Sequence, residues 1–352
     1  MAASPLLTER IARHGFVDRP DRTAADAAAR TTAIQAQDAP AAWLGVRARS
    51  AGLTEADVLC AVAEARVVRT WLMRGTIHLV APADVRWLVA LIGPSIIRKY
   101  RTRWRQLGLA DAVLDRVVEH LPDVLAAGPL TRREIRAALA DCGVTLDSAD
   151  PQAMTHALVH ASSVGLVCRA AGNTFTLLDF WLPDAPAGPT GDDALAELAR
   201  RYFAAYSPAT TNDFATWSGL AGGRAVSLIR DELEPTDVDG RPGWRLGSVE
   251  PARGLRLLPA FDNYLIGYRH RDAILSADLR PRIYAGGLIH PAVLLDGEVI
   301  GRWSLNRSAD PAVVTVQRFR SFSRTVRLAV DEEVADIGRF IGRTATLDVL
   351  DR

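Results

Sequence analysis

Apolar residues recur at helical spacing in three stretches of the chain, and each stretch begins with the same polar signal. Thr54, Thr131 and Thr210 each stand three residues before an Asp or a Glu, which is the capping-box pattern of a helix start. Thr131 follows Thr54 by 77 residues, and Thr210 follows Thr131 by 79 residues. The nearly constant interval predicts three repeated structural units.

Each start signal is followed by helical spacing and then by a β-prone segment. The helical and β-prone segments are residues 56–68 and 69–80, residues 151–164 and 166–178, and residues 223–231 and 244–246. Helices followed by strands are typical of a winged helix-turn-helix, which binds DNA in many proteins and mediates protein contacts in others. The pattern therefore predicts three tandem winged helix-turn-helix units, here called repeats 1 to 3, and leaves both roles open.

Short β-prone runs separated by turns replace this pattern from about residue 255. Asp296-Gly297 between two apolar runs is a strong hairpin signal, and the Pro- and Gly-rich residues 183–191 predict a linker. We expect an α+β fold. Its predicted parts are repeat 1 at residues 1–108, repeat 2 at 109–182, a linker with repeat 3 at 183–250, and a β-rich C-terminal domain at 251–352.

Composition predicts a soluble, cytoplasmic protein of more than one structural part. The chain has 352 residues and 49% hydrophobic content, whereas single cores stop growing near about 250–300 residues. Charged residues interrupt every apolar run before the about 18 residues of a membrane helix, and the N-terminus lacks a signal-peptide pattern. Cys60, Cys142 and Cys168 are widely spaced among apolar residues, which predicts reduced, buried thiols.

Charge type is more informative than net charge, which is only +1. Lys99 is the only lysine among 42 basic residues, so nearly all are arginine, whose planar fork suits phosphate. A GC-rich genome produces the same bias. Arginines cluster at residues 98–105 and 318–327, and each cluster is either a phosphate-binding surface or a solvated face.

A polar interruption at residues 31–40 (TTAIQAQDAP) separates two apolar, helix-prone stretches. In an extended backbone Gln35 and Gln37 project to one side while Ala36 faces away. Two carboxamides can hold a water, a sugar or a base edge, but they do not take up a proton near neutral pH. The alternative interpretation is that the pair satisfies backbone groups at a helix start.

Residues 35–45 (QAQDAPAAWLG) resemble the Q-x-Q or Q-x-D element of the AlkZ-like (YcaQ-related) DNA glycosylases. Residues 69–80 (RTWLMRGTIHLV) and 258–268 (LPAFDNYLIGY) resemble two further segments of that family, in the same order. The resemblance implies three winged-helix units and a β-rich C-terminal domain that form a C-shaped DNA-binding channel.

The resemblance also implies an activity, the removal of N-alkylated purines, N7-alkylguanine above all, from double-stranded DNA by a monofunctional glycosylase. Some members protect producers of DNA-alkylating natural products. Alkylation at N7 makes the base cationic, so the glycosidic bond breaks without a protonating acid. The enzyme then has to stabilise an oxocarbenium-like sugar and align water, and hydrogen-bonding glutamines can do both.

Gln35 and Gln37 are therefore the predicted catalytic residues, with Asp38 as support if the backbone turns it inward. Some relatives carry Asp where this chain has Gln37, which points to a subgroup with specialised adducts. Bulky or crosslinked adducts are compatible with this subgroup. Base flipping and access without extrusion both stay open.

Two further segments contain candidate DNA contacts. If residues 73–80 form one strand, Arg74, Thr76 and His78 share a face that either meets DNA or makes structural hydrogen bonds. In the segment after residue 260, Arg269 and Arg271 are predicted phosphate contacts.

Asp262, Asn263 and Tyr264 lie in that same segment and pose a similar choice. They either face DNA or tie the β-rich domain to the winged-helix repeats.

Other catalytic signatures do not emerge from the sequence. His156 and His160 lack the Glu of H-E-x-x-H, so we interpret them as solvent-facing or capping residues rather than zinc ligands. We expect no metal, no cofactor and no membrane contact, and a monomer associated with the bacterial nucleoid. The alternatives are a non-enzymatic winged-helix transcriptional regulator, which would dimerise on a defined sequence, and a protein-interaction scaffold.

Overall fold

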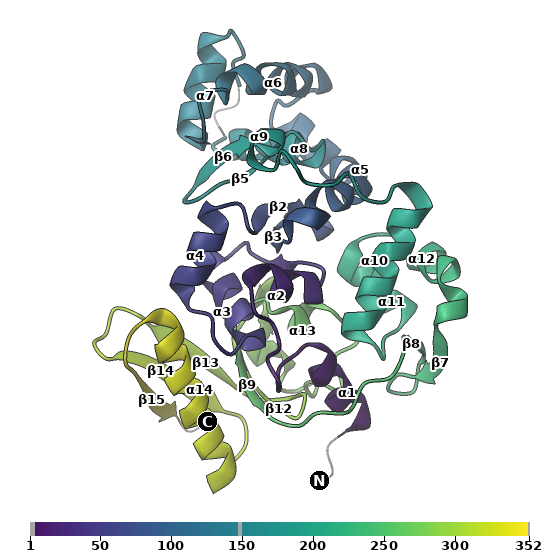
Figure 1. Cartoon of the computed structure of the whole chain (residues 1–352), viewed down its shortest axis with the longest axis vertical. Helices are drawn as coiled ribbons and strands as arrows, with labels where there is room; N and C mark the ends of the chain where they lie inside the picture. Colours follow the sequence, from purple (N-terminus) through teal and green to yellow (C-terminus); the bar gives the residue numbers. More distant parts are fainter. Residues whose placement is uncertain (1–3, 147–149, 351–352) are drawn as a thin grey trace. The chain divides into compact units, whose positions relative to one another are not determined.

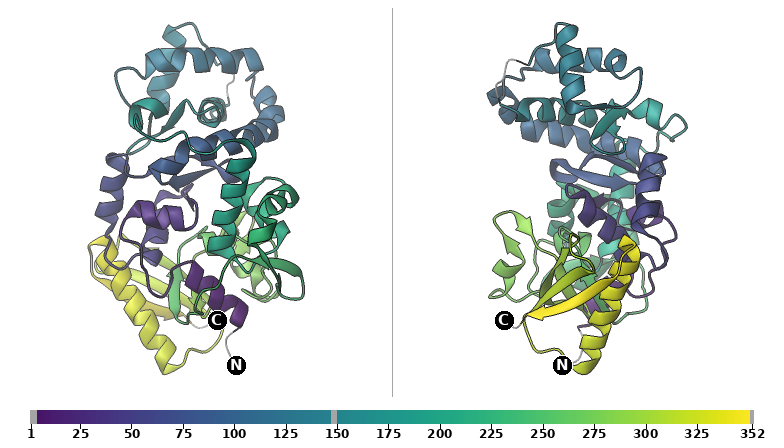
Figure 2. Two further views of the ribbon diagram at one scale, coloured as in Figure 1. Left: turned by 45° about the vertical axis from the view of Figure 1, so that its right-hand side comes forward. Right: turned by 90° about the vertical axis from the view of Figure 1, so that its left-hand side faces the viewer.

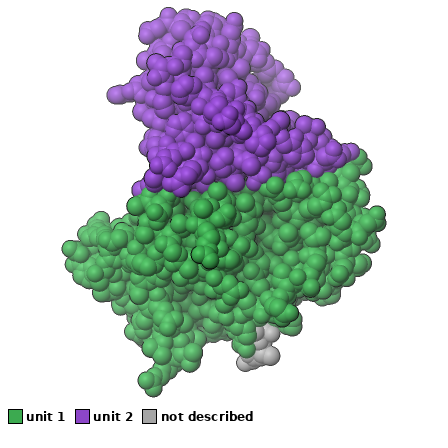
Figure 3. Space-filling view, viewed as in Figure 1, with its two compact units in different colours: residues 1–58, 196–352 green, residues 59–195 purple. Residues whose placement is uncertain are grey.

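The computed structural model describes residues 4–146 and 150–350. The chain divides into two compact units (Figure 3). Unit 1 comprises residues 1–58 and 196–352, and unit 2 comprises residues 59–195. Each unit has its own core and is described by itself.

Unit 2 combines helices with one antiparallel sheet (Figure 1). Its helices are α5 (Pro82–Gln106), α6 (Asp111–Val124), α7 (Arg132–Asp141), α8 (Gln152–Ser163) and α9 (Leu178–Trp181). Its strands run in the order β3 (Thr76–Val80), β2 (Val68–Leu72), β5 (Val167–Arg169), β6 (Thr174–Leu177) and β4 (Leu130–Thr131). A Cβ at Gly93 would lie 2.0 Å from the Ser163 carbonyl oxygen, so glycine is what allows α5 to approach α8 this closely.

Unit 1 contains the two ends of the chain. Its helices are α1 (Pro5–Arg13), α2 (Ala24–Arg30), α3 (Ala39–Arg49), α11 (Thr211–Ser218), α12 (Gly222–Leu228), α13 (Asn263–Ile266) and α14 (Arg324–Ile341), while α4 (Glu55–Ala63) and α10 (Gly191–Tyr206) cross the division between the units. Its short strands are β1 (Ile34–Gln35), β7 (Glu234–Asp237), β8 (Pro242–Arg245), β10 (Tyr284–Ala285) and β11 (Leu288–Ile289).

A mixed sheet forms the C-terminal part of unit 1. Its strands run in the order β15 (Ala345–Leu350), β14 (Ala312–Arg318), β13 (Glu298–Asn306), β12 (Ala292–Leu295) and β9 (Leu255–Leu258). The predicted hairpin at Asp296-Gly297 is confirmed, because it joins β12 to β13 with both residues at positive φ. The 18-residue α14 was not predicted, and it packs against β9 and β15 (Figure 2).

The order helix, strand, helix, helix, strand, strand occurs repeatedly along the chain. It is α2, β1, α3, α4, β2, β3 and then α6, β4, α7, α8, β5, β6. A third series is α10, the bridge Ala209–Trp244, α11, α12, β7, β8. The predicted linker at residues 183–191 separates the second series from the third and lies almost wholly outside helices and strands.

The three predicted capping boxes are confirmed at Thr54, Thr131 and Thr210. However, Thr54 caps the helix directly before the strands, whereas Thr131 and Thr210 cap the helix before that one. The near-equal intervals therefore join positions that are not equivalent. A fourth box, in which Thr23 caps α2, carries the same sequence pattern and was missed.

The cysteine prediction is partly wrong. Cys168 is buried, and burial raises the pKa of its thiol to about 12. Cys60, within α4, and Cys142, at the C-cap of α7, are exposed rather than packed in the core. All three thiols are free. Within the described part of the chain, no helix combines the length and the apolar composition that a membrane span needs.

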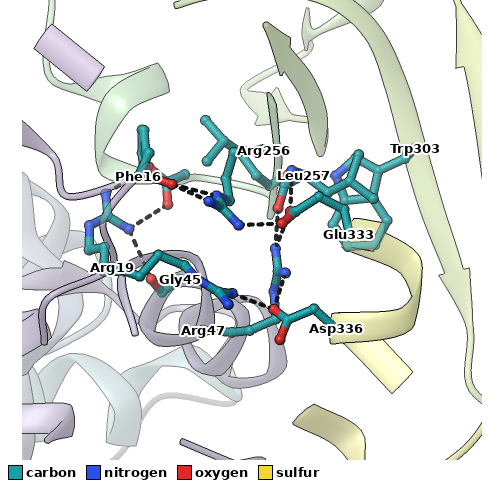
Figure 4. A network of polar contacts seen from close by, with 12 residues as sticks. Phe16, Arg19, Gly45, Arg47, Arg256, Leu257, Trp303, Glu333 and Asp336 are labelled. Carbon is teal, nitrogen blue, oxygen red and sulfur yellow. Dashed lines mark hydrogen bonds and ion pairs between the residues drawn. The ribbon is translucent and has the colours of Figure 1, made fainter. Parts of the chain in front are cut away.

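A buried ionic network fixes α3 to the C-terminal part of unit 1 (Figure 4). Arg47 on α3 is fully buried and pairs with Glu333 at 3.1 Å and with Asp336 at 2.8 Å, both on α14. Glu333 also pairs with Arg256 and accepts a hydrogen bond from the Leu257 backbone N–H. Because α3 directly follows the Gln35 segment, this network immobilises one side of the candidate site.

Candidate active site

The Gln35–Gln37 segment connects β1 to α3. Gln35 is the last residue of β1 and is 8% exposed, Ala36 is fully buried, and Gln37 is exposed in the bend that follows. Asp38 is the N-cap of α3, where its carboxylate accepts a hydrogen bond from the Ala41 backbone N–H at 3.2 Å. The capping role proposed as an alternative for the glutamines thus belongs to Asp38.

Asn263 holds the backbone around Gln35. Its Oδ1 accepts a hydrogen bond from the Gln35 N–H at 3.3 Å, and its Nδ2 donates to the Ala33 carbonyl oxygen at 2.6 Å. Nδ2 also donates to the Tyr206 hydroxyl oxygen, and that hydroxyl donates to the Thr31 carbonyl oxygen. Asn263 is 1% exposed, so α13 clamps the β1 segment with one buried carboxamide.

Asp262 lies beneath this clamp and pairs with Arg49 of α3. The two contacts measure 2.9 and 3.0 Å, and both side chains are fully buried. Arg49 also donates to His14 Nδ1, and burial together with nearby arginines lowers the pKa of His14 well below its usual value. His14 is therefore neutral, and its full burial separates it from any substrate.

Tyr264 completes the predicted trio, and its hydroxyl donates to the Gly297 carbonyl oxygen at 2.8 Å. It is fully buried. The described contacts of all three residues after Phe261 thus lie within the protein. Such contacts fit the second interpretation given above, in which these residues tie the C-terminal part of the chain to the rest of the protein rather than face DNA.

Arg74, Thr76 and His78 lie in unit 2, and residues 73–80 do not form the single strand that a shared face of the three side chains required. Residues Met73–Gly75 form a 3-10 turn, η1, in which Arg74 has φ 59°, so β3 begins only at Thr76. A Cβ at Gly75 would lie 2.5 Å from the Tyr100 ring, and Lys99 Nζ donates to the Arg74 carbonyl oxygen at 2.7 Å. The close packing of α5 explains the turn.

His78 is 2% exposed and faces the interior. Its Nδ1 lies 2.9 Å from the Thr76 carbonyl oxygen, so this nitrogen carries the proton and donates it. Burial and the nearby Arg74 lower the pKa of His78 to about 3. The imidazole is therefore neutral at physiological pH and offers no positive charge to a phosphate.

Arg269 and Arg271 differ in their surroundings. Arg269 is exposed, and its backbone N–H donates to Asp213 at 2.7 Å, so the residue is anchored at the start of α11. The Arg271 guanidinium lies over the Tyr284 ring, 4.4 Å from its centroid. Both remain within unit 1, the unit that holds Gln35.

His156 and His160 are half-buried rather than solvent-facing, which corrects the prediction. His156 Nδ1 accepts a hydrogen bond from Trp104 at 3.1 Å, and the His160 ring contacts the same indole edge-on. Among the residues described, no group of three His, Cys, Asp or Glu side chains is arranged to hold a metal ion.

The clamped strand β1 ends in one carboxamide, Gln35, and a second, Gln37, follows in the bend; carboxamides can hydrogen-bond water and polar groups but do not take up a proton near neutral pH. Such a site fits an enzyme whose substrate already carries an activated leaving group. The family model of the DNA glycosylase AlkZ-like proteins matches residues 28–340. The chain therefore belongs to the AlkZ-like DNA glycosylase family and is a DNA glycosylase.

Two comparisons agree with this assignment. The chain is 29% identical over 358 residues to an interstrand DNA cross-link repair glycosylase of Streptomyces sahachiroi, with 95% of each protein covered. It is also similar to the solved structure of Streptomyces sahachiroi DNA glycosylase AlkZ, with a TM-score of 0.83 and 27% identity over 100% of both chains.

Proposed function

We propose that this glycosylase is monofunctional and releases N7-alkylguanine and related N-alkylated purines, bulky adducts included, from double-stranded DNA. Gln35 and Gln37 are the proposed catalytic residues. The observation that carries the proposal is the clamp on β1, because Asn263 bonds the backbone on both sides of Ile34 and so fixes the backbone from which the Gln35 side chain projects.

The chemistry follows from the charge of the substrate. An N7-alkylated guanine departs as a neutral base, so the bond breaks without a general acid and leaves positive charge on the sugar. A carboxamide oxygen can face that charge and accept a hydrogen bond from the attacking water. Gln35 supplies a held group and Gln37 an exposed one next to it, and Asp38 at the cap of α3 adds negative charge nearby.

The relative's name extends the proposal to crosslinks. That protein is an interstrand cross-link repair glycosylase, and an exposed Gln37 is compatible with a substrate too bulky for a closed pocket. We therefore include crosslinked purines among the substrates, in base excision repair or in self-resistance of an antibiotic producer.

DNA binding is proposed to use three winged-helix repeats that line a channel. The recurring series of helices and strands supports this division, and the exposed Arg269 is the best-supported phosphate contact. Arg271, Arg74 and Thr76 remain proposed contacts, and a monomer at the nucleoid remains the proposed working form.

The test is incubation with a duplex that contains N7-methylguanine, followed by alkaline cleavage of abasic sites. We expect base release, no strand break before alkali and full activity in EDTA, because a cationic leaving group needs no Lewis acid. A regulator would release no base from N7-alkylated substrates, whether small or bulky, and that result would contradict the proposal.

A further inference from the structure

Unit 2 contains an open cavity of about 520 Å³ at the start of α7. The start of α7 contributes Arg132 and Arg133, and strand β5 contributes Arg169. Trp71 and Phe175 from β2 and β6 also line it. None of the functions described so far uses these residues.

The cavity concentrates positive charge. Among the residues that the structure describes, no Asp or Glu lines it. Arg132 donates to the Thr155 hydroxyl oxygen, and Arg169 donates to Asn173 Oδ1 at 2.8 Å, so both of these guanidinium groups have neutral partners. The nearby Glu134 is engaged in the capping box of α7, where it accepts from the Thr131 backbone and side chain.

The arginines repel one another. Arg69 lies opposite Arg169 in the pairing of β2 with β5, and burial together with Arg169 lowers the pKa of Arg69 to about 10. Burial and the charge of Arg132 likewise lower the pKa of Arg169. An anion in the cavity would relieve this repulsion, which makes anion binding more favourable.

Aromatic packing holds the site in shape. The Trp71 and Phe175 rings are nearly parallel, with centroids 6.1 Å apart, and both side chains are almost fully buried. The Arg169 guanidinium lies 5.3 Å from the Phe175 ring centroid. Its Nη2 donates to Asn173 Oδ1, and a guanidinium carries five N–H donors in all, so the group has donor capacity left for a ligand.

We propose that this cavity binds a phosphate group of the DNA backbone through Arg132, Arg133 and Arg169. A guanidinium presents its donors in a planar fork that matches phosphate oxygens. Three guanidinium groups line this one cavity, so they can surround a single phosphate. The choice of DNA as the source of the phosphate rests on the proposed function, whereas the anion site rests on the arginines alone.

The test measures binding of an unmodified, fluorescently labelled duplex at several NaCl concentrations. The double variant Arg132→Gln/Arg133→Gln and the single variant Arg169→Gln are compared with Arg136→Gln, an exposed arginine of the same helix that does not line the cavity. Each lost phosphate contact makes the slope of log K against log[NaCl] shallower by about 0.9. Because the three arginines hold the same phosphate, we expect a change of about one unit in the double variant, a change of up to about one unit in Arg169→Gln, and none in the control.

Melting temperatures in chloride and in inorganic phosphate of equal ionic strength form the second arm. Stabilisation of the wild type by phosphate that is lost in the variants supports the anion site. If that stabilisation appears while the DNA salt slope stays unchanged, the ligand is free phosphate and the DNA source is wrong. Unchanged slopes with no phosphate effect overturn the proposal altogether.

The Arg132 and Arg133 side chains are exposed, so their replacement tests the site without disturbing the core. Binding to unmodified DNA does not require base excision. If the variants change the salt slope but the wild type releases no alkylated base, the proposed function is wrong and the phosphate site stands. If the wild type releases the base but the variants leave the slope unchanged, only the phosphate site is wrong.

Discussion

Asn263 is the residue on which the geometry of Gln35 depends most directly. Its carboxamide bonds the Gln35 N–H and the Ala33 carbonyl oxygen from a position 228 residues further along the chain. It acts as a positioning residue, since it holds backbone and does not face the substrate.

The variant Asn263→Ala should slow excision far more than it weakens DNA binding. Three buried polar groups lose a partner, and each unsatisfied group costs about 1–3 kcal/mol, so the melting temperature should also fall. Displacement of Gln35 by about 1 Å should cost about 10²-fold in the single-turnover excision rate, measured well below the melting temperature. The affinity for undamaged duplex should stay unchanged.

Asn263→Asp is the conservative comparison. A carboxylate keeps the acceptor for the Gln35 N–H and loses the donor to Ala33, so its excision rate should lie between those of the wild type and Asn263→Ala. A folded Asn263→Ala protein with the wild-type rate would show that the clamp has no effect on catalysis.

The residue scale also shows what the sequence could reveal about the site. Gln35 and Gln37 were identified because a Q-x-Q element is local and distinctive. The pairs Gln35–Asn263 and Arg49–Asp262 join residues more than 200 positions apart, as their separations of 228 and 213 show. No local pattern marks such partners, so Arg49, His14 and Tyr206 were missed.

At the scale of elements, α3 and α14 form the frame behind the site. Arg47 of α3 is fully buried and depends on Glu333 and Asp336 of α14 for its counter-charges. Removal of one partner from a buried network leaves an uncompensated charge, which is a larger effect than the net stabilisation of an intact pair.

Glu333→Gln should therefore lower the free energy of unfolding by about 3–5 kcal/mol. Arg47 and Arg256 both lose a carboxylate partner, while the shape of the side chain is kept. Urea unfolding measures the effect, and the matched control is Glu332→Gln, an exposed neighbour on the same helix. Equal unfolding midpoints for the two variants would mean that the network contributes nothing.

Several elements with local signals were predicted, whereas a turn set by packing was not. The capping boxes and the Asp296-Gly297 hairpin have sequence signatures, and the structure contains them. The turn at Met73–Gly75 arises from the Tyr100 ring behind Gly75, a contact that its own segment does not reveal. The helix α14 does carry local signals, with Ser323 as N-cap and Gly342 as C-cap, and it was missed among its β-prone neighbours.

At the scale of the whole molecule, the proposed catalytic residues and the proposed phosphate site lie in different compact units. Unit 1 holds Gln35, Gln37 and the Asn263 clamp, whereas unit 2 holds the arginine-lined cavity. The net charge of +1 leaves no general basic field, which agrees with the proposal that local groups of arginines provide the phosphate contacts. Family membership makes the chain a DNA glycosylase, and the remaining central claim concerns its catalytic residues.

The most direct test of that claim is the single-turnover rate of N7-methylguanine release from duplex DNA by the wild type, Gln35→Ala, Gln37→Ala and the double variant. Loss of one hydrogen bond at a developing charge costs about 10²–10³-fold, and we expect a slowing of this order in each single variant. The double variant should lose less than the product of the two effects if both glutamines hold one water. Wild-type rates in both single variants would contradict the account and remove Gln35 and Gln37 from the mechanism.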